Sequence, residues 1–237
     1  MDEDQKVGSP VTFLVILTFI ASYLPPYVRD PIISIGLTTA ITILYFVISA
    51  VRPPKDLQGK VFIYLISLQI GIFAFAIYSD IVPSVWPAYA IIGFITIAVI
   101  WAIHVKVYEL DMGIVLFYAI FHIFNFVSGV FRVYIDYPWW DVITHFLGAF
   151  LLTLLIFVVF KNRRVFRSRD PRVAAAFALI VAAFIASVVE ILEWFGNALN
   201  TDVTLTWTDT VWDLVFNNLG ALTGAYYSLW LDEKPGK

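Results

Sequence analysis

The sequence predicts an all-α, polytopic transmembrane helix bundle of about eight helices, and three observations support this prediction. Of the 237 residues, 61% are hydrophobic and 14% charged, with a mean hydropathy of +0.86, whereas soluble domains are roughly 45–50% apolar. Apolar runs near the spanning length of about 20 residues recur along the chain. Basic residues gather in connections that would share one side of a membrane. We therefore expect one integral membrane domain, residues 1–237.

Eight apolar runs are the expected helices: 11–28, 32–51, 61–79, 84–103, 112–131, 141–160, 173–194 and 209–230. Pro25 and Pro26 interrupt the first run, so a bundle of seven spans is the alternative. The acidic start, MDEDQK, and the absence of a small-residue cleavage site predict that this run is retained. Helices one to four, within residues 1–110, form a scaffold or a substrate path in this interpretation, and helices five to eight, within 111–237, carry the polar site.

The basic residues also predict the orientation. With eight helices, only Arg29 and Arg132 fall on one side of the membrane, and the other side receives Lys6, the loop 52–60, Lys106, the loop 161–172, Lys234 and Lys237. By the positive-inside rule the second side is cytoplasmic. We therefore expect a multi-pass protein of the cell membrane with both termini in the cytoplasm. Six tryptophans then lie near the outer boundary and two near the inner one, as in an interfacial aromatic belt.

Composition excludes several function classes. The chain has no cysteine, which rules out disulfides, thiolate metal sites and cysteine nucleophiles. The basic run at 161–172 is interpreted as a topology signal rather than a nucleic-acid contact, so the lipid bilayer is the expected partner and nucleic acid is not.

Three pairs of ionisable residues are the main clue to function, because such groups are costly at membrane depth and usually functional. The pairs are Asp141 and His145, Glu190 and Glu193, and Asp209 and Asp213. The rise per residue of a helix places all three within about 12 Å of the outer boundary. Residues three or four apart share a helix face, so each pair forms part of a polar stripe, and the stripe of the last helix continues through Asn217 to Gly220 and Gly224.

Five carboxylates and a histidine cannot all stay charged and unpaired there. They must bind cations, take up protons or open widely to water, and carboxylates with one imidazole suit Mg, Mn, Fe or Zn. The predicted ligands of a divalent metal are Asp141, His145, Glu190 and Asp213, with Glu193 or Asp209 as general base.

Simpler interpretations exist for some of these residues. Asp141 and Asp209 stand at helix starts, where aspartate is a favoured N-cap, and Glu193 lies near a helix end and can be solvated. Asn217 is either a hydrogen-bonding link between helices or part of the site. His122 is expected to be a buried, satisfied histidine.

The segments DVITHFLGAF, EILEWF and TDTVWDLVFNNLGALTGA resemble the YjdF-like family of bacterial inner-membrane proteins. The shared spacings are D-x-x-x-H-F, E-x-x-E-W and D-x-x-x-D followed by Gly-Ala, over about the last 100 residues of the chain. The resemblance places the six paired residues and Gly220 at motif positions, although TLTWT replaces a glycine-containing stretch before Asp209. A more distant similarity to VanZ-like proteins lies in the sixth helix. The resemblance implies a shared site without naming a reaction.

Two function classes fit this pattern. One is a membrane-embedded metal-dependent hydrolase or transferase acting on a lipid or lipid-linked substrate. The alternative is a cation- or proton-coupled transporter or ion-binding protein. The outward position of the cluster favours the enzyme, because transport sites tend to lie near the midplane between repeated halves.

The predicted orientation is testable because the chain has no native cysteine. We expect Thr204→Cys to react with a membrane-impermeant thiol reagent in intact cells, and Ser168→Cys to react only after lysis. The reverse labelling would place the paired residues at the cytoplasmic face.

Overall fold

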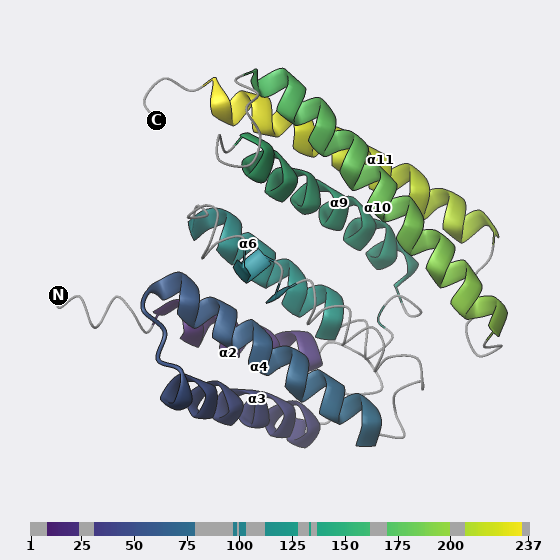
Figure 1. Ribbon diagram of the computed structural model, residues 1–237. Helices are drawn as coiled ribbons and strands as arrows, with labels where there is room; N and C mark the ends of the chain where they lie inside the picture. The colour runs from purple at the N-terminus through teal and green to yellow at the C-terminus, as the bar shows by residue number, and fades with distance from the viewer. Residues whose placement is uncertain are drawn as a thin grey trace. The chain divides into compact units, whose positions relative to one another are not determined.

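Most of the residues that the structure describes are helical. The computed structural model describes residues 9–23, 31–78, 97–98, 100–102, 112–127, 133, 137–161, 170–199 and 207–233, and no strand occurs among them. The named helices (Figure 1) are α2 Ser9–Tyr23, α3 Pro31–Val51, α4 Leu57–Tyr78, α6 Met112–His122, the π-helix η1 Ile123–Val127, α9 Pro138–Lys161, α10 Pro171–Leu199 and α11 Trp207–Asp232. The all-α prediction is confirmed.

The predicted runs coincide with these helices except at 84–103, most of which lies outside the described residues. Among the residues that the structure describes, four helices are long and apolar enough to cross a membrane, over Pro31–Val51, Leu57–Phe75, Pro138–Lys161 and Pro171–Ile191. Helix α11 is not among them, although it has 26 residues. Its aspartates and asparagines lower its hydropathy, so the residues proposed for the site are also those that weaken it as an independent span.

Local sequence explains where the helices begin. Helices α3, α9 and α10 start at a proline, which has no backbone N–H to leave unsatisfied in the first turn. Asp170 caps α10, because its Oδ1 accepts from the Arg172 backbone N at 2.9 Å. Asp56 caps α4 in the same way, accepting from the Gly59 backbone N at 2.6 Å.

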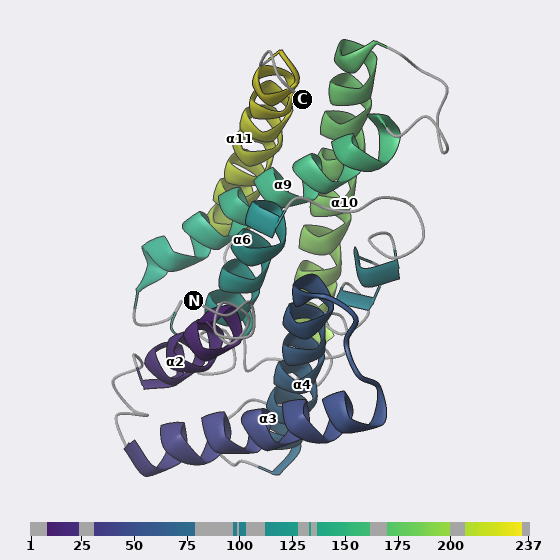
Figure 2. The ribbon, with the colours of Figure 1, turned by 90° about the vertical axis from the view of Figure 1, so that its left-hand side faces the viewer.

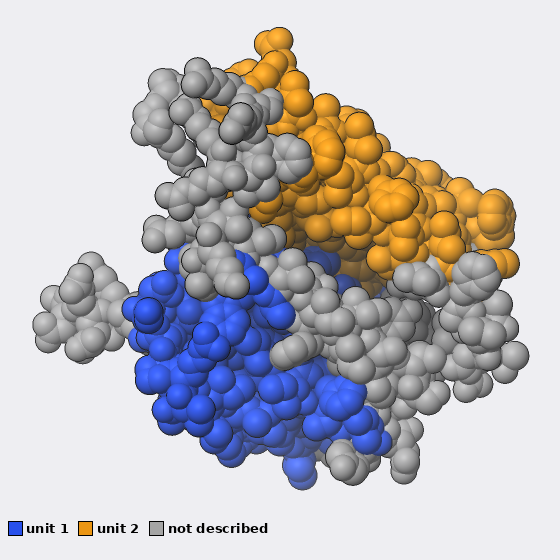
Figure 3. Space-filling view, in the orientation of Figure 1, with its two compact units in different colours: residues 1–104, 110–137 blue, residues 105–109, 138–237 orange. Residues whose placement is uncertain are grey.

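The chain divides into two compact units (Figure 3): Met1–His104 with Leu110–Tyr137, and Val105–Glu109 with Pro138–Lys237. We call them unit 1 and unit 2. The described helices of unit 1 are α2, α3, α4, α6 and η1, and those of unit 2 are α9, α10 and α11. Helix α6 therefore groups with the N-terminal helices, whereas the sequence placed it in the half that carries the site. The single domain over residues 1–237 stays a prediction.

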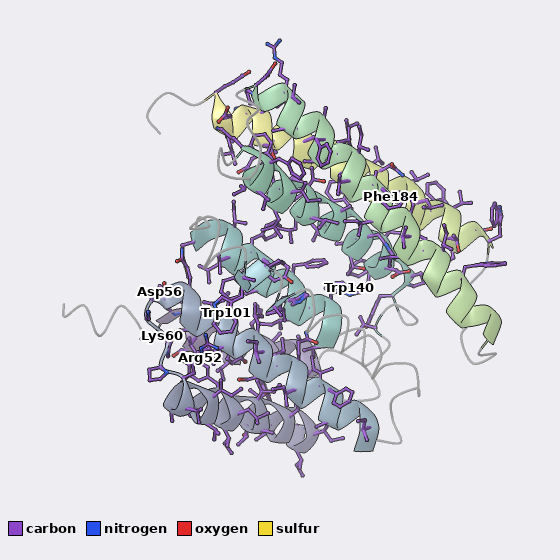
Figure 4. The ribbon with its side chains drawn as sticks, viewed as in Figure 1. Arg52, Asp56, Lys60, Trp101, Trp140 and Phe184 are labelled. Carbon is purple, nitrogen blue, oxygen red and sulfur yellow. The ribbon has the colours of Figure 1, made fainter. Side chains whose placement is uncertain are left out.

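Unit 1 contains buried polar contacts between helices. Helix α3 contacts both α2 and α4 (Figure 2). The hydroxyls of Thr18 on α2 and Tyr64 on α4 lie 2.8 Å apart, and both residues are fully buried. Near the start of α4, the Arg52 guanidinium lies over the Trp101 ring, 5.4 Å from its centroid (Figure 4). These contacts connect the helices of unit 1 to one another.

Unit 2 is a bundle of three helices in which α10 runs antiparallel to α9 and α11 (Figure 1). Its core is built from small residues of α10 and α11, chiefly alanines, against Phe157 of α9. The outward face of α10 is apolar and open, and Phe184 (Figure 4) is 68% exposed there. Where α9 and α11 end, an ion pair joins Lys161 of α9 to Asp232 of α11.

Glycines allow the backbones of α9 and α11 to touch. A Cβ placed on Gly220 would overlap the carbonyl oxygen of Phe146, and one on Gly224 would come within 2.8 Å of the carbonyl oxygen of Phe150. Close approach of this kind is typical of small residues at membrane helix interfaces. It places the N-terminal turns of the two helices side by side.

We expect Gly220→Ala to lower the free energy of unfolding in detergent by about 1–3 kcal/mol, because the added methyl overpacks a backbone contact. Gly36→Ala is the matched control, since a Cβ there has nothing within 4 Å. Equal thermal stability of the two variants would contradict direct contact between α9 and α11.

Candidate metal centre

His145 stands at the centre of a polar cluster in unit 2. Its Nδ1 lies 3.0 Å from Glu190 Oε1. Its Nε2 lies 3.5 Å from Asp141 Oδ1 and 3.7 Å from Asp213 Oδ1. Asp141 and His145 belong to α9, Glu190 to α10 and Asp213 to α11. One imidazole therefore contacts carboxylates from all three helices of the unit.

Helical register explains why these side chains meet. The buried positions of α10 recur every four residues and continue into Glu190: Ala174, Ala178, Ala182 and Ala186. On α9 the buried positions Phe157, Thr153 and Ala149 lead to His145 at the same interval. Residues four apart lie on one face, one turn above the other. Each row of mostly small core residues thus ends in a member of the cluster.

Asn217 is a further member of the cluster. Its Nδ2 donates to Glu190 Oε1 at 3.0 Å and lies 3.2 Å from His145 Nδ1. The sequence offered two interpretations of Asn217, a hydrogen-bonding link between helices or a part of the site. In the structure Asn217 contacts two predicted ligands, Glu190 and His145. The signal in the sequence was its position one turn after Asp213.

Burial decreases toward the end of the unit where α9 and α11 begin. The side chains of Glu190 and Asp213 are 3% and 4% exposed, whereas that of Asp141 is 27% exposed. Tryptophans at this end are exposed on all three helices: Trp139, Trp194, Trp207 and Trp212. Exposed tryptophans are typical of the membrane–water interface. The cluster therefore lies near the tryptophan-rich end of unit 2, and the partly exposed side chain of Asp141 faces that end.

Carboxylates outnumber basic side chains within the cluster. In the part of the chain that the structure describes, its ion pairs join three carboxylates to His145 and to no lysine or arginine. Ligand atoms of Asp141, His145 and Asp213 all lie within 4.8 Å of one another. Buried charges need a partner because their desolvation is costly. This group has the donor chemistry and the convergence of a cation site.

Of the two predicted general bases, the structure describes the side chain of Asp209 but not that of Glu193. Asp209 lies in the first turn of α11, one turn before Asp213, and is half-buried. It interacts electrostatically with Asp141, His145 and Glu190. Glu193 lies in α10 one turn after Glu190, but its side chain is outside the described residues.

Two other features lie away from the cluster. A shallow apolar hollow on α11 is lined by Val211, Leu214, Val215, Asn218, Leu219 and Leu222. At about 100° per residue, these positions lie on the face of α11 opposite Asp213 and Asn217. His122 belongs to unit 1, is buried as expected, and its Nε2 lies 3.1 Å from the Tyr118 hydroxyl.

Comparison with known proteins identifies one family. A family model described as predicted membrane protein (DUF2238) matches residues 60–234. The matched region includes every candidate site residue. No curated protein and no solved structure matches the chain.

We expect His145→Leu to lower the free energy of unfolding by about 3–5 kcal/mol in metal-free detergent solution, because it leaves buried carboxylates without their partner. Adding Glu190→Leu to that variant removes one of these carboxylates and should recover part of the loss. Chemical unfolding of the single and double variants measures this coupling. Ile143→Leu, at an exposed position of α9, is the control. If His145→Leu and Ile143→Leu were equally stable, the carboxylates would be solvated.

Proposed function

The chain belongs to the DUF2238 family of predicted membrane proteins, and from this premise we propose that its cluster binds a divalent metal at the outer membrane face. In this proposal the protein is a metal-dependent hydrolase or transferase that acts on a lipid or lipid-linked substrate. The closer assignment to YjdF-like proteins is part of the proposal and rests on the motif spacings of the last three helices.

The observation that carries the proposal is the convergence of His145 Nε2 with two carboxylate oxygens. Donor atoms around an ion bound at about 2.0–2.2 Å lie about 3.0–3.5 Å from one another. The 3.5 Å and 3.7 Å distances from Nε2 to Asp141 and Asp213 are close to that spacing. Small side-chain movements would therefore bring the three groups onto one ion.

The donor set restricts the metal. Two carboxylates and one imidazole suit Zn, Mn, Mg or Fe, and the chain has no thiolate to offer a softer ion. Three protein ligands leave a position for water or substrate, as in catalytic rather than structural zinc sites. Glu190, which the sequence also predicted as a ligand, contacts the other nitrogen of the ring.

A divalent ion in this position would polarise a phosphoryl or carbonyl oxygen or activate a water. Asp209 is the proposed proton acceptor, because it is half-buried and lies one turn closer to the start of α11 than Asp213. Glu193 is the second candidate, from its position in α10. The buried contacts of Glu190 and Asp213 hold the cluster in place while Asp141 faces the more open side.

The position of the cluster supports a lipid substrate. A molecule with a polar head at the tryptophan-rich end could reach Asp141 while its apolar chain stays among the exposed apolar side chains of the helices. The outward orientation rests on the asymmetry of lysine and arginine, with both termini in the cytoplasm.

The metal assignment is tested by elemental analysis of purified protein. We expect about one equivalent of metal in the wild type, and a loss of most of it in His145→Ala, Asp213→Asn and Asp141→Asn. His104→Ala, which changes a histidine that is not among the predicted ligands, should retain it. Equal metal content in all four variants would contradict the site. A pH-dependent cation flux in liposomes without retained metal would favour the transporter.

A further inference from the structure

We infer that Glu190 and Asn217 are positioning residues that keep a proton on His145 Nδ1, so that the lone pair of the neutral ring lies on Nε2 and faces Asp141 and Asp213. The proton position follows from the contacts alone, and the purpose of the exposed lone pair rests on the proposed metal site. Glu190 is then outside the set of metal ligands.

Three atoms, one each from Glu190, His145 and Asn217, lie in mutual contact. Glu190 Oε1 is 3.0 Å from His145 Nδ1 and 3.0 Å from Asn217 Nδ2, and the two nitrogens are 3.2 Å apart. An amide nitrogen donates hydrogen bonds and does not accept them. With the amide turned over, Asn217 would set its carbonyl oxygen against Glu190 Oε1, which places two acceptors in contact. Asn217 therefore donates to Glu190.

Distance decides which ring nitrogen holds the proton. N–H···O hydrogen bonds have heavy-atom distances of about 2.7–3.2 Å. The contact of Nδ1 with Glu190, at 3.0 Å, lies in this range, and those of Nε2 with Asp141 and Asp213, at 3.5 Å and 3.7 Å, lie outside it. A proton on Nδ1 makes a good hydrogen bond, whereas a proton on Nε2 makes none of normal length.

Acceptor capacity supports the same assignment. A carboxylate oxygen has two lone pairs and can accept from both His145 Nδ1 and Asn217 Nδ2. In the opposite arrangement a protonated Glu190 would donate to Nδ1, and the single lone pair of Nδ1 would meet both Glu190 and the Asn217 amide. Glu190 therefore accepts from Nδ1 and does not donate to it.

A fixed tautomer has a direct consequence for the site. With Nδ1 protonated, Nε2 faces two carboxylate oxygens, and this convergence is satisfied by a positive charge between them, either a second ring proton or a bound metal ion. A carboxylate bonded to the far nitrogen of a metal-binding histidine orients the ring and raises its basicity, and its loss typically weakens metal binding about 10–100-fold. Asn217 lies one turn from Asp213 on α11, so the same helix supplies a ligand and a support for the ring.

The proton position is measured by nitrogen NMR of histidine ring-labelled, metal-free protein. The chain has three histidines, and His145→Gln identifies the resonances of His145. We expect Nδ1 to be protonated in the wild type whether the ring is charged or neutral, and Glu190→Leu and Asn217→Leu to populate the other tautomer when the ring is neutral. Asn218→Leu is the matched control, because Asn218 is exposed and donates to the Leu214 carbonyl of its own helix. A wild-type ring with Nε2 protonated and Nδ1 unprotonated would overturn the inference.

Metal titration separates a positioning residue from a ligand. We expect Glu190→Leu and Asn217→Leu to weaken Zn or Mn binding about 10–100-fold while the stoichiometry at saturation is kept, and Asp213→Asn to remove the site. Loss of stoichiometry in Glu190→Leu, as in Asp213→Asn, would make Glu190 a ligand and overturn the inference. If the wild type binds no metal, the proposed function fails, and the tautomer measurement still decides the role of Glu190 and Asn217.

Discussion

The pairing of one imidazole with carboxylates from three helices is the constraint on which unit 2 depends. In an apolar environment an unpaired carboxylate is costly, so α9, α10 and α11 must meet in one register to satisfy Glu190 and Asp213. The rest of the unit serves this register. Alanines on α10 and glycines on α11 let the helices approach closely, and the ion pair of Lys161 with Asp232 joins the opposite ends of α9 and α11.

Much of this arrangement could be predicted from spacing. Asp141 and His145 are four residues apart, as are Asp213 and Asn217, and helix geometry alone puts the members of each pair on one face. Spacing does not determine the rotation of one helix against another. Which ring nitrogen of His145 contacts Glu190 depends on that rotation. The sequence therefore predicted Glu190 as a metal ligand, because spacing does not show that it contacts Nδ1 while Asp141 and Asp213 face Nε2.

The sequence was less informative where the helix itself changes. Regular α-helical spacing would place His122 and Asn125, three residues apart, on one face. Helix α6 ends at His122 and continues as the π-helix η1, in which hydrogen bonds span five residues. The wider turn alters the angle between successive side chains, and apolar composition gives no signal for it. The grouping of α6 with α2 and α4 likewise depends on tertiary contacts.

The polarity of α11 also bears on how the protein enters the membrane. An aspartate costs up to about 2.5–3.5 kcal/mol during insertion when it lies at the centre of a spanning helix and less toward the helix ends, and Asp213 and Asn217 both lie in α11. Helix α11 is therefore a poor insertion signal by itself. Helices α9 and α10 precede it in the chain and are more apolar, so His145 and Glu190 are available as hydrogen-bond partners when α11 arrives. We therefore expect insertion of α11 to depend on the polar contacts that α9 and α10, which are synthesised before it, provide.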